Sequence, residues 1–184
     1  MLKKSIIVSL LSVALFFQAC KDKKEDANSM VATSKFELND LDKKSHTISR
    51  AGNNFNLDDA KGKVVMFDIF ATWCPPCQAE ASHLASLQSK YKDDLIVAGV
   101  SIQKDITADE LVKFQNEHGA KYMMLSGADN QKVAQTIAST LPGVEADFPI
   151  PLMAMYKDGT LVNFYVGATP EEMIESDIKK ALGK

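Results

Sequence analysis

Hydrophobic positions follow β-strand patterns in several short segments of the chain. Apolar and polar residues alternate over 36–41, and a returning strand over 45–50 completes a predicted N-terminal hairpin. Continuous apolar runs at 64–70 and 95–100 are typical of strands that are buried on both faces of a sheet. A polar, asparagine-rich stretch connects the hairpin to the first of these runs. Further strands are predicted at 122–125, 152–156 and 160–166, the last two flanking the turn Lys157-Asp158-Gly159.

Helical periodicity alternates with these strands. Apolar residues after Cys77 share one side of a predicted helix, at Ala81, Leu84, Ala85, Leu87 and Tyr91. Thr107 and Glu110 form a capping-box pattern that opens a second helix, which is predicted to end near Gly119.

Two more helices complete the pattern. Asp129 is predicted to cap a helix that runs through Thr140. The last helix is predicted to start with Thr169 as cap and Pro170 as its first residue, and to close at Gly183. Strands that alternate with helices and end in a hairpin and a helix predict an α/β fold with a central mixed β-sheet.

Composition narrows the possible functions. The 184-residue chain has a net charge of −3, which gives no basic surface for nucleic acid. Of its three cysteines, Cys20 lies near the N-terminus, and Cys74 and Cys77 lie in a part long enough for one globular domain. Two cysteines are too few for a disulfide-stapled scaffold, so their expected role is chemistry.

The N-terminus has the pattern of an export signal. Lys3 and Lys4 precede an apolar segment, 5–17, that is shorter than the roughly 20 residues of a membrane span but suits a signal peptide. The junction before Cys20 resembles that of a bacterial lipoprotein, in which the cysteine is lipidated and becomes the mature N-terminus. Ordinary cleavage or an uncleaved anchor, with Cys20 as a spare thiol, is the alternative.

The chain is therefore expected to have three parts. A lipoprotein signal peptide is predicted at 1–19 and the domain at 36–184. Between them, residues 20–35 contain the lipidated Cys20 and a flexible tether, because the side chains after Cys20 are charged or small and have little to bury.

The sequence Cys74-Pro75-Pro76-Cys77 lies between an apolar strand and a helix-patterned segment. Two thiols at this spacing can close a short disulfide and open it again. A helix that starts inside the pair presents unpaired N–H groups and its positive end to Cys74, which favours the thiolate, the nucleophile of disulfide exchange. We therefore expect Cys74 to be exposed and to attack. Cys77 is expected to be partly buried and to resolve the mixed disulfide.

Half of a zinc site is the alternative for this pair, because cysteines at this spacing also bind metal ions. A structural zinc ion needs two further ligands, and the chain has no second cysteine pair. His46, His83 and His118 show no metal-ligand spacing, and each is interpreted as a surface or helix-face residue. The sequence therefore predicts redox chemistry, with no metal and no cofactor beyond the disulfide itself.

Residues 68–77, Asp-Ile-Phe-Ala-Thr-Trp-Cys-Pro-Pro-Cys, resemble the active-site segment of the thioredoxin superfamily. Ile150-Pro151, followed by a Lys-Asp-Gly turn, resembles its cis-proline strand and hairpin. The N-terminal hairpin, the Gly-Lys before the first apolar run and the Trp-Cys-x-Pro-Cys motif are most similar to the TlpA/ResA group of exported thiol–disulfide oxidoreductases. This resemblance implies a thioredoxin-like three-layer fold with a central strand–helix insertion, for which 102–140 is long enough.

Two carboxylates accompany the cysteines. Asp68 lies inside an apolar strand, where burial would raise its pKa, and the resemblance matches it to thioredoxin's buried aspartate, which exchanges a proton beneath the second cysteine. Glu80 lies on roughly the helical face of Cys77, where the TlpA/ResA group carries a glutamate. The alternatives are an Asp68 that reaches solvent and a first-turn Glu80 that complements the helix dipole. Which carboxylate handles the proton stays open.

The remaining candidate residues are expected to influence the reduction potential of the cysteine pair or to bind the substrate protein. Pro76 fixes the backbone angle φ at the helix start, and neither Pro75 nor Pro76 has an N–H. The first turn therefore offers few hydrogen-bond donors to the Cys74 thiolate, which predicts a low, reducing potential for the cysteine pair. Trp73 is expected to give an apolar docking face, with core packing as the alternative. In the family, the proline corresponding to Pro151 packs against the disulfide, and the backbone before it, at Ile150, pairs with an extended substrate segment.

These features predict a monomeric disulfide reductase on the envelope side of a bacterial membrane, held there by the lipid on Cys20 and facing the periplasm or extracytoplasmic side. Electrons would come from a membrane thiol donor and pass to cysteine-containing client proteins, with apocytochrome c as a candidate. An oxidase or isomerase on the same fold is the nearest alternative. A metallochaperone lacks further ligands, and a peroxidase lacks its Pro-x-x-x-Thr-x-x-Cys arrangement.

Overall fold

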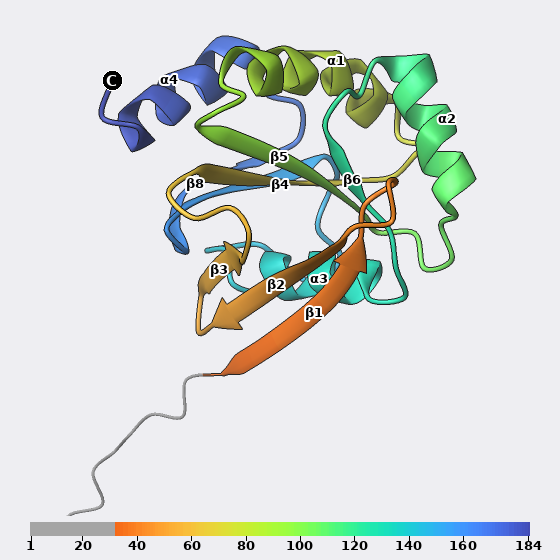
Figure 1. Cartoon of the computed structure of the whole chain (residues 1–184), viewed down its shortest axis with the longest axis horizontal. Helices are drawn as coiled ribbons and strands as arrows, with labels where there is room; N and C mark the ends of the chain where they lie inside the picture. Colours follow the sequence, from red (N-terminus) through yellow and green to blue (C-terminus); the bar gives the residue numbers. More distant parts are fainter. Residues whose placement is uncertain (1–31) are drawn as a thin grey trace, which may run out of the picture. The chain divides into compact units, whose positions relative to one another are not determined.

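Eight strands and four helices make up the part of the chain that the computed structural model describes, residues 32–184 (Figure 1). The predicted signal peptide, Cys20 and most of the predicted tether fall in residues 1–31 and lie outside the described residues. Within residues 32–184, no helix combines the length and the apolar character that a membrane crossing requires.

The predicted elements are present in the predicted order. The strands are β1 (Thr33–Asn39), β2 (Ser45–Ala51), β3 (Asn54–Leu57), β4 (Val64–Phe70), β5 (Leu95–Ser101), β6 (Met123–Leu125), β7 (Leu152–Lys157) and β8 (Thr160–Val166). The helices are α1 (Pro75–Lys90), α2 (Ala108–His118), α3 (Asn130–Ala138) and α4 (Glu171–Ala181).

These strands form two sheets. β1, β2 and β3 form an antiparallel sheet, and the other five strands form a mixed sheet in the order β6-β5-β4-β7-β8. β4 pairs in parallel with β5 and antiparallel with β7, so both of its edges are satisfied. All seven residues of β4 are buried, which confirms the reading of its continuous apolar run.

Different elements cover the two faces of the mixed sheet (Figure 1). Met66 and Phe70 of β4 belong to a core with residues of α1, α2 and α4, whereas Phe67 and Ile69 pack with α3 and the three-stranded sheet. Because successive side chains of a strand point to opposite faces, Asp68 shares the face of Met66 and Phe70. The expected three-layer α/β fold is therefore confirmed, and it turns Asp68 toward α1.

The helix ends confirm some predicted caps and correct others. Thr107 and Glu110 form the expected capping box on α2, and Gly119 ends that helix with a φ of 67°. Asp129 occupies the N-cap position of α3, but its side chain makes no capping hydrogen bond. Pro170 is the N-cap of α4 and not its first residue, because its ψ of 135° is extended.

β3 is a strand that the hydrophobic pattern does not indicate. Only Phe55 and Leu57 of its four residues are buried, and so short an alternation cannot be told from a loop. Pairing with β2 defines the strand, together with the contact between the rings of Phe55 and Tyr156, whose centroids are 5.6 Å apart. β1 likewise begins at Thr33, inside the predicted tether, because its first residues pair with the end of β2.

The interpretation of His46 as a surface residue is wrong. This side chain is buried between two carboxylates, with Nε2 at 2.9 Å from Asp40 Oδ2 and Nδ1 at 3.1 Å from Asp59 Oδ2. Lys44 Nζ also forms an ion pair with Asp59 Oδ2, at 2.7 Å. These polar contacts join the turn after β1 to the segment after β3, and so hold the three-stranded sheet together at one end.

Candidate active site

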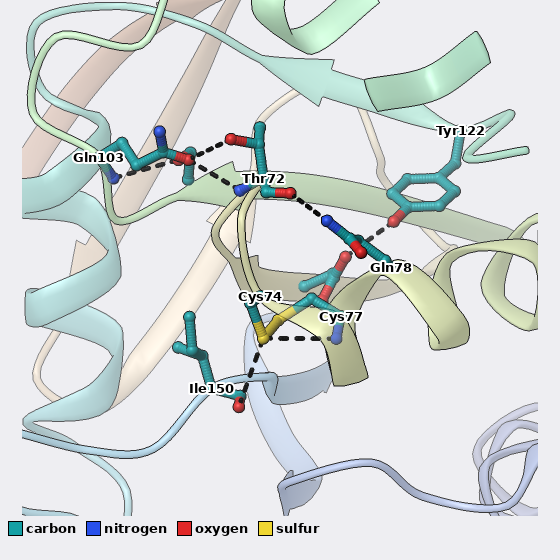
Figure 2. The surroundings of a disulfide bond; sticks show 9 residues. Thr72, Cys74, Cys77, Gln78, Gln103, Tyr122 and Ile150 are labelled. Atoms are coloured by element: carbon teal, nitrogen blue, oxygen red, sulfur yellow. Dashed lines mark hydrogen bonds between the residues drawn. A yellow bond between two sulfur atoms is a disulfide. The ribbon is translucent and has the colours of Figure 1, made fainter. Parts of the chain in front are cut away.

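Cys74 and Cys77 are joined by a disulfide at the start of α1 (Figure 2). Cys74 is the N-cap of this helix, and Pro75 and Pro76 are its first two residues. The Cys77 N–H donates to Cys74 Sγ at 3.4 Å, and the Gln78 N–H donates to the Cys74 carbonyl at 3.0 Å. The two prolines have no N–H, so Cys77 supplies the donor of the first turn that reaches the sulfur.

Cys74 is not the more exposed of the two cysteines, contrary to the expectation from the sequence. Cys74 is 3% exposed and Cys77 is 4% exposed. The loop before β7 covers the first sulfur, because Cys74 Sγ lies 3.8 Å from the carbonyl oxygen of Ile150. The Ile150–Pro151 peptide bond is cis, as the family resemblance implied. Position in the helix, and not exposure, distinguishes the two sulfurs.

Trp73 forms an exposed apolar surface beside the disulfide. Its side chain is 63% exposed, so the alternative of core packing is wrong. Pro75 and Pro76 are exposed next to it. A cavity of about 220 Å³ extends from Trp73 to Phe114 of α2. Trp73 and the two prolines therefore present apolar side chains at the surface beside the disulfide, and their use in docking stays a prediction.

A hydrogen-bond network that sequence reasoning missed holds the loop before Cys74. Gln103 Oε1 accepts from the backbone N–H of Thr72 at 2.8 Å and from its hydroxyl at 3.0 Å. Gln78 Nε2 donates to the Thr72 carbonyl at 2.7 Å (Figure 2). The position of Gln103, just after the buried strand parallel to β4, was an available signal, because the carboxyl ends of adjacent parallel strands meet at one edge of a sheet.

Asp68 is buried on the α1 side of the sheet, so the alternative in which it reaches solvent is wrong. Its side chain is 4% exposed, and its Oδ2 accepts the hydroxyl of Tyr122 at 2.8 Å. Burial raises the pKa of Asp68 from 3.8 to about 6, although the Tyr122 hydrogen bond acts in the opposite direction. Tyr122 is a second residue near the site that sequence reasoning missed, since nothing in its strand pattern indicates its contact.

Glu80 is also buried and lies beyond the first turn of α1, so the alternative of a first-turn acid is wrong. Its Oε1 accepts the backbone N–H of Thr169 at 3.0 Å, and its Oε2 has no hydrogen-bond partner among the described residues. The pKa of Glu80 is raised from 4.5 to about 7, mainly by burial and to a smaller degree by the charge of Asp68, whereas the Thr169 hydrogen bond acts in the opposite direction.

The structure thus brings most of the predicted residues together. The disulfide, the cis peptide bond and Trp73 surround one surface, and the two carboxylates lie in the layer that α1 covers. Over residues 32–184, no group of three or more His, Cys, Asp or Glu side chains is arranged to hold a metal ion. Predicted Cys20 lies outside the described residues.

Replacing Asp68 with asparagine should stabilise the oxidised protein above about pH 6. The pKa of Asp68 in the folded protein, about 6, exceeds the ordinary value of 3.8. The folded protein therefore holds the Asp68 proton more tightly than the unfolded chain does. The contribution of Asp68 to the free energy of unfolding is highest below about pH 4 and falls as the pH rises to about 6, because the unfolded chain ionises first. Asparagine has no charge to bury and avoids this loss, which is about 3 kcal/mol for a shift of about two pH units. Urea denaturation of both proteins from pH 4 to 8 measures the difference.

The Glu80→Gln protein is compared with the Asp68→Asn protein, because the pKa of Glu80 is raised to about 7. The stabilising effect of Glu80→Gln should still grow between pH 6 and 7, where that of Asp68→Asn has levelled off. A difference between wild type and Asp68→Asn that is the same at every pH would contradict the raised pKa.

Comparisons with known proteins agree with this geometry. The Redoxin family model matches residues 23–182. The thiol-disulfide oxidoreductase ResA of Bacillus thuringiensis is 28% identical over 130 residues, which cover 70% of this chain and 69% of ResA. The thioredoxin-like protein YneN of Bacillus subtilis is 25% identical over 132 residues, which cover 70% of this chain and 71% of YneN.

A solved structure shares the fold. A thiol:disulfide interchange protein of the thioredoxin family from Chlorobium tepidum superposes with a TM-score of 0.62 at 20% identity, covering 84% of this chain and 97% of that one. The family model spans most of the chain, and the Cys74–Cys77 disulfide lies at the start of α1, just after β4. The chain therefore belongs to the Redoxin family and is a thiol–disulfide oxidoreductase of the TlpA/ResA type within the thioredoxin superfamily.

Proposed function

We propose that the chain is a reductase of protein disulfides. The observation that carries this direction is the cap of α1. Cys74 Sγ accepts the N–H of Cys77, while Pro75 and Pro76 supply none. A Cys74 thiolate with few donors is less stabilised, so the dithiol form gives up its electrons more readily. The redox group is the Cys74–Cys77 pair itself, and no other cofactor is needed.

The reaction would proceed by two exchanges. The Cys74 thiolate attacks one sulfur of a client disulfide, forming a mixed disulfide and releasing the other client sulfur as a thiolate. Cys77 then loses its proton to a buried carboxylate, Asp68 or Glu80, and attacks Cys74 Sγ. The Cys74–Cys77 disulfide forms and the second client thiolate leaves, so the client gains two electrons and the dithiol loses two. A membrane thiol donor would return the pair to its reduced form.

Client binding would use the surface around Trp73 and the cis peptide bond. The Pro151 carbonyl already accepts the Gly167 N–H at 2.8 Å, whereas the Ile150 carbonyl faces Cys74 Sγ. An extended client segment could pair with the Ile150 backbone, a form of strand addition, while its side chains contact Trp73 and the exposed prolines. Movement of the Ile150 carbonyl away from Cys74 Sγ would make this sulfur accessible to the client thiol or disulfide.

The setting that we propose is the extracytoplasmic side of a bacterial membrane. The lysine-flanked apolar segment and Cys20 support export and lipid anchoring. The chain would act there as a monomer on cysteine-containing proteins, with apocytochrome c as one candidate client. An oxidase or isomerase role on the same fold is separated from this proposal by the reduction potential.

Replacing Cys77 with alanine should trap clients as mixed disulfides on Cys74, because the resolving thiol is absent. Reduced Cys77→Ala protein is incubated with an envelope extract, and adducts are detected on a non-reducing gel and released by dithiothreitol. Cys74→Ala is the matched control and should trap nothing. Adducts that form through Cys77 in the Cys74→Ala protein would reverse the assigned order of attack.

The reduction potential of the pair should lie nearer thioredoxin's value of about −270 mV than DsbA's value of about −120 mV. Pro76→Ala restores an N–H at the second helical position, from which N-cap side chains commonly accept a hydrogen bond, and should raise the potential by about 30–60 mV. Pro75→Ala restores an N–H at the first position and should have a smaller effect. Titration against glutathione measures all three, and a wild-type value near that of DsbA would favour an oxidase.

Cys20→Ala should release the protein from membranes or leave an unprocessed precursor, because the thiol that receives the lipid is absent. Cell fractionation followed by mass spectrometry of the N-terminus measures both outcomes. Cys74→Ala should remain in the membrane fraction and controls for the loss of a cysteine. An unmodified mature chain that begins at another residue would rule out lipidation.

A further inference from the structure

Tyr122 contacts Asp68 although the two residues lie on different sides of a strand that separates them in the sheet. It directly precedes β6, and β5 lies between β6 and β4 in the strand order. The Tyr122 side chain nevertheless crosses β5, and its hydroxyl donates to Asp68 Oδ2 on β4 at 2.8 Å. Both residues are buried, and Figure 2 shows the hydroxyl end of Tyr122 carrying this bond.

Gly99 provides the space for this crossing. It is the β5 residue in register with Asp68, so it lies directly beneath the path of the ring. A Cβ at this position would lie 3.3 Å from Tyr122 Cε2 and 2.7 Å from Met124 Sδ. The φ of Gly99 is not positive, so the glycine is explained by close approach and not by backbone conformation.

The two buried carboxylates have different partners as a result. Asp68 receives a hydroxyl hydrogen bond, and Tyr122 is the residue within 32–184 that supplies it. Glu80 receives one backbone N–H from Thr169 and keeps Oε2 without a partner in that same part of the chain. A hydrogen bond donated to a carboxylate favours its ionised form, and the negative charge of one carboxylate favours the protonated form of the other.

Building on the proposed exchange reaction, we propose that Tyr122 is a positioning residue that makes Asp68, and not Glu80, the acceptor of the Cys77 proton. In that step the Cys77 S–H bond breaks and an O–H bond forms on Asp68. Cys77 Sγ then bonds to Cys74 Sγ, and the client sulfur leaves with the electron pair of the broken mixed disulfide. Tyr122 keeps its own proton throughout and acts through Asp68.

The titration of these groups agrees with this division of roles. Burial raises the pKa of both carboxyl groups, to about 6 for Asp68 and to about 7 for Glu80, and the Tyr122 hydroxyl opposes this rise at Asp68. Burial and the nearby carboxylates raise the pKa of Tyr122 well above its ordinary value, so its hydroxyl remains a donor at neutral pH. Without the hydroxyl, Asp68 would ionise at a higher pH and lose its advantage over Glu80.

Tyr122→Phe tests the proposal by removing the hydroxyl and keeping the ring. The carboxyl ¹³C resonance of Asp68, followed by NMR from pH 4 to 9 in the oxidised protein, should titrate about one pH unit higher than in wild type. The pH dependence of mixed-disulfide resolution should move in the same direction. An Asp68 titration that does not change in a folded Tyr122→Phe protein would overturn the proposal.

Tyr165→Phe is the matched control. The Tyr165 hydroxyl donates to Asp177 at 2.8 Å, and its strand position lies in the same row as Asp68, separated from it by Met153 of β7. This variant also loses a tyrosine–aspartate hydrogen bond, but it should leave the Asp68 titration unchanged. A similar shift in Tyr165→Phe would mean that the effect is general loosening, which would count against the proposal.

Gly99→Ala is a second test if Tyr122→Phe does not fold. The added methyl group would lie 3.3 Å from both the Tyr122 ring and Phe70 Cε1, so the Tyr122 ring must shift by a few tenths of an ångström while its hydroxyl remains, and the flexible end of Met124 must move aside. The Asp68 titration should again shift upward, and no shift would overturn the proposal. Because these titrations use the oxidised protein, they decide whether Tyr122 favours the ionised form of Asp68 even if wild type fails to reduce client disulfides, which would refute only the proposed function.

Discussion

Burial of β4 on both faces is the constraint from which the active site follows. The strand is hydrogen-bonded along both edges and covered by helices on one face and by α3 and the three-stranded sheet on the other. Any carboxylate on this strand loses its water, which is why the pKa of Asp68 is raised. The chain leaves the sheet where β4 ends, and the first helix begins there with Cys74 as its cap.

Two carboxylates share the layer between the sheet and α1. Burial raises the pKa of Asp68 to about 6 and that of Glu80 to about 7, so both carboxyl groups take up protons nearer neutral pH than ordinary acids do. The hydrogen bonds differ, because Tyr122 donates a hydroxyl to Asp68 whereas Thr169 donates a backbone N–H to Glu80.

Much of the fold was predictable because local signals and burial agreed. The apolar run of β4, the capping box at Thr107 and the turn before β8 each predicted an element that the structure contains. Prediction failed where long-range pairing decides the outcome. β3 depends on β2 and on the ring of Tyr156, and His46 is buried because two carboxylates from separate loops close around it.

The sequence by itself determined the chemistry, because two cysteines separated by two prolines at a strand–helix junction specify a redox pair and its capping geometry. The tertiary structure alone decided how that pair is covered and which groups surround it. Ile150 lies against Cys74, and Gln103 holds the loop before it. Tyr122 reaches Asp68 across Gly99. These contacts join residues 31 or more positions apart, and the packing of the sheet, not local sequence pattern, brings them together.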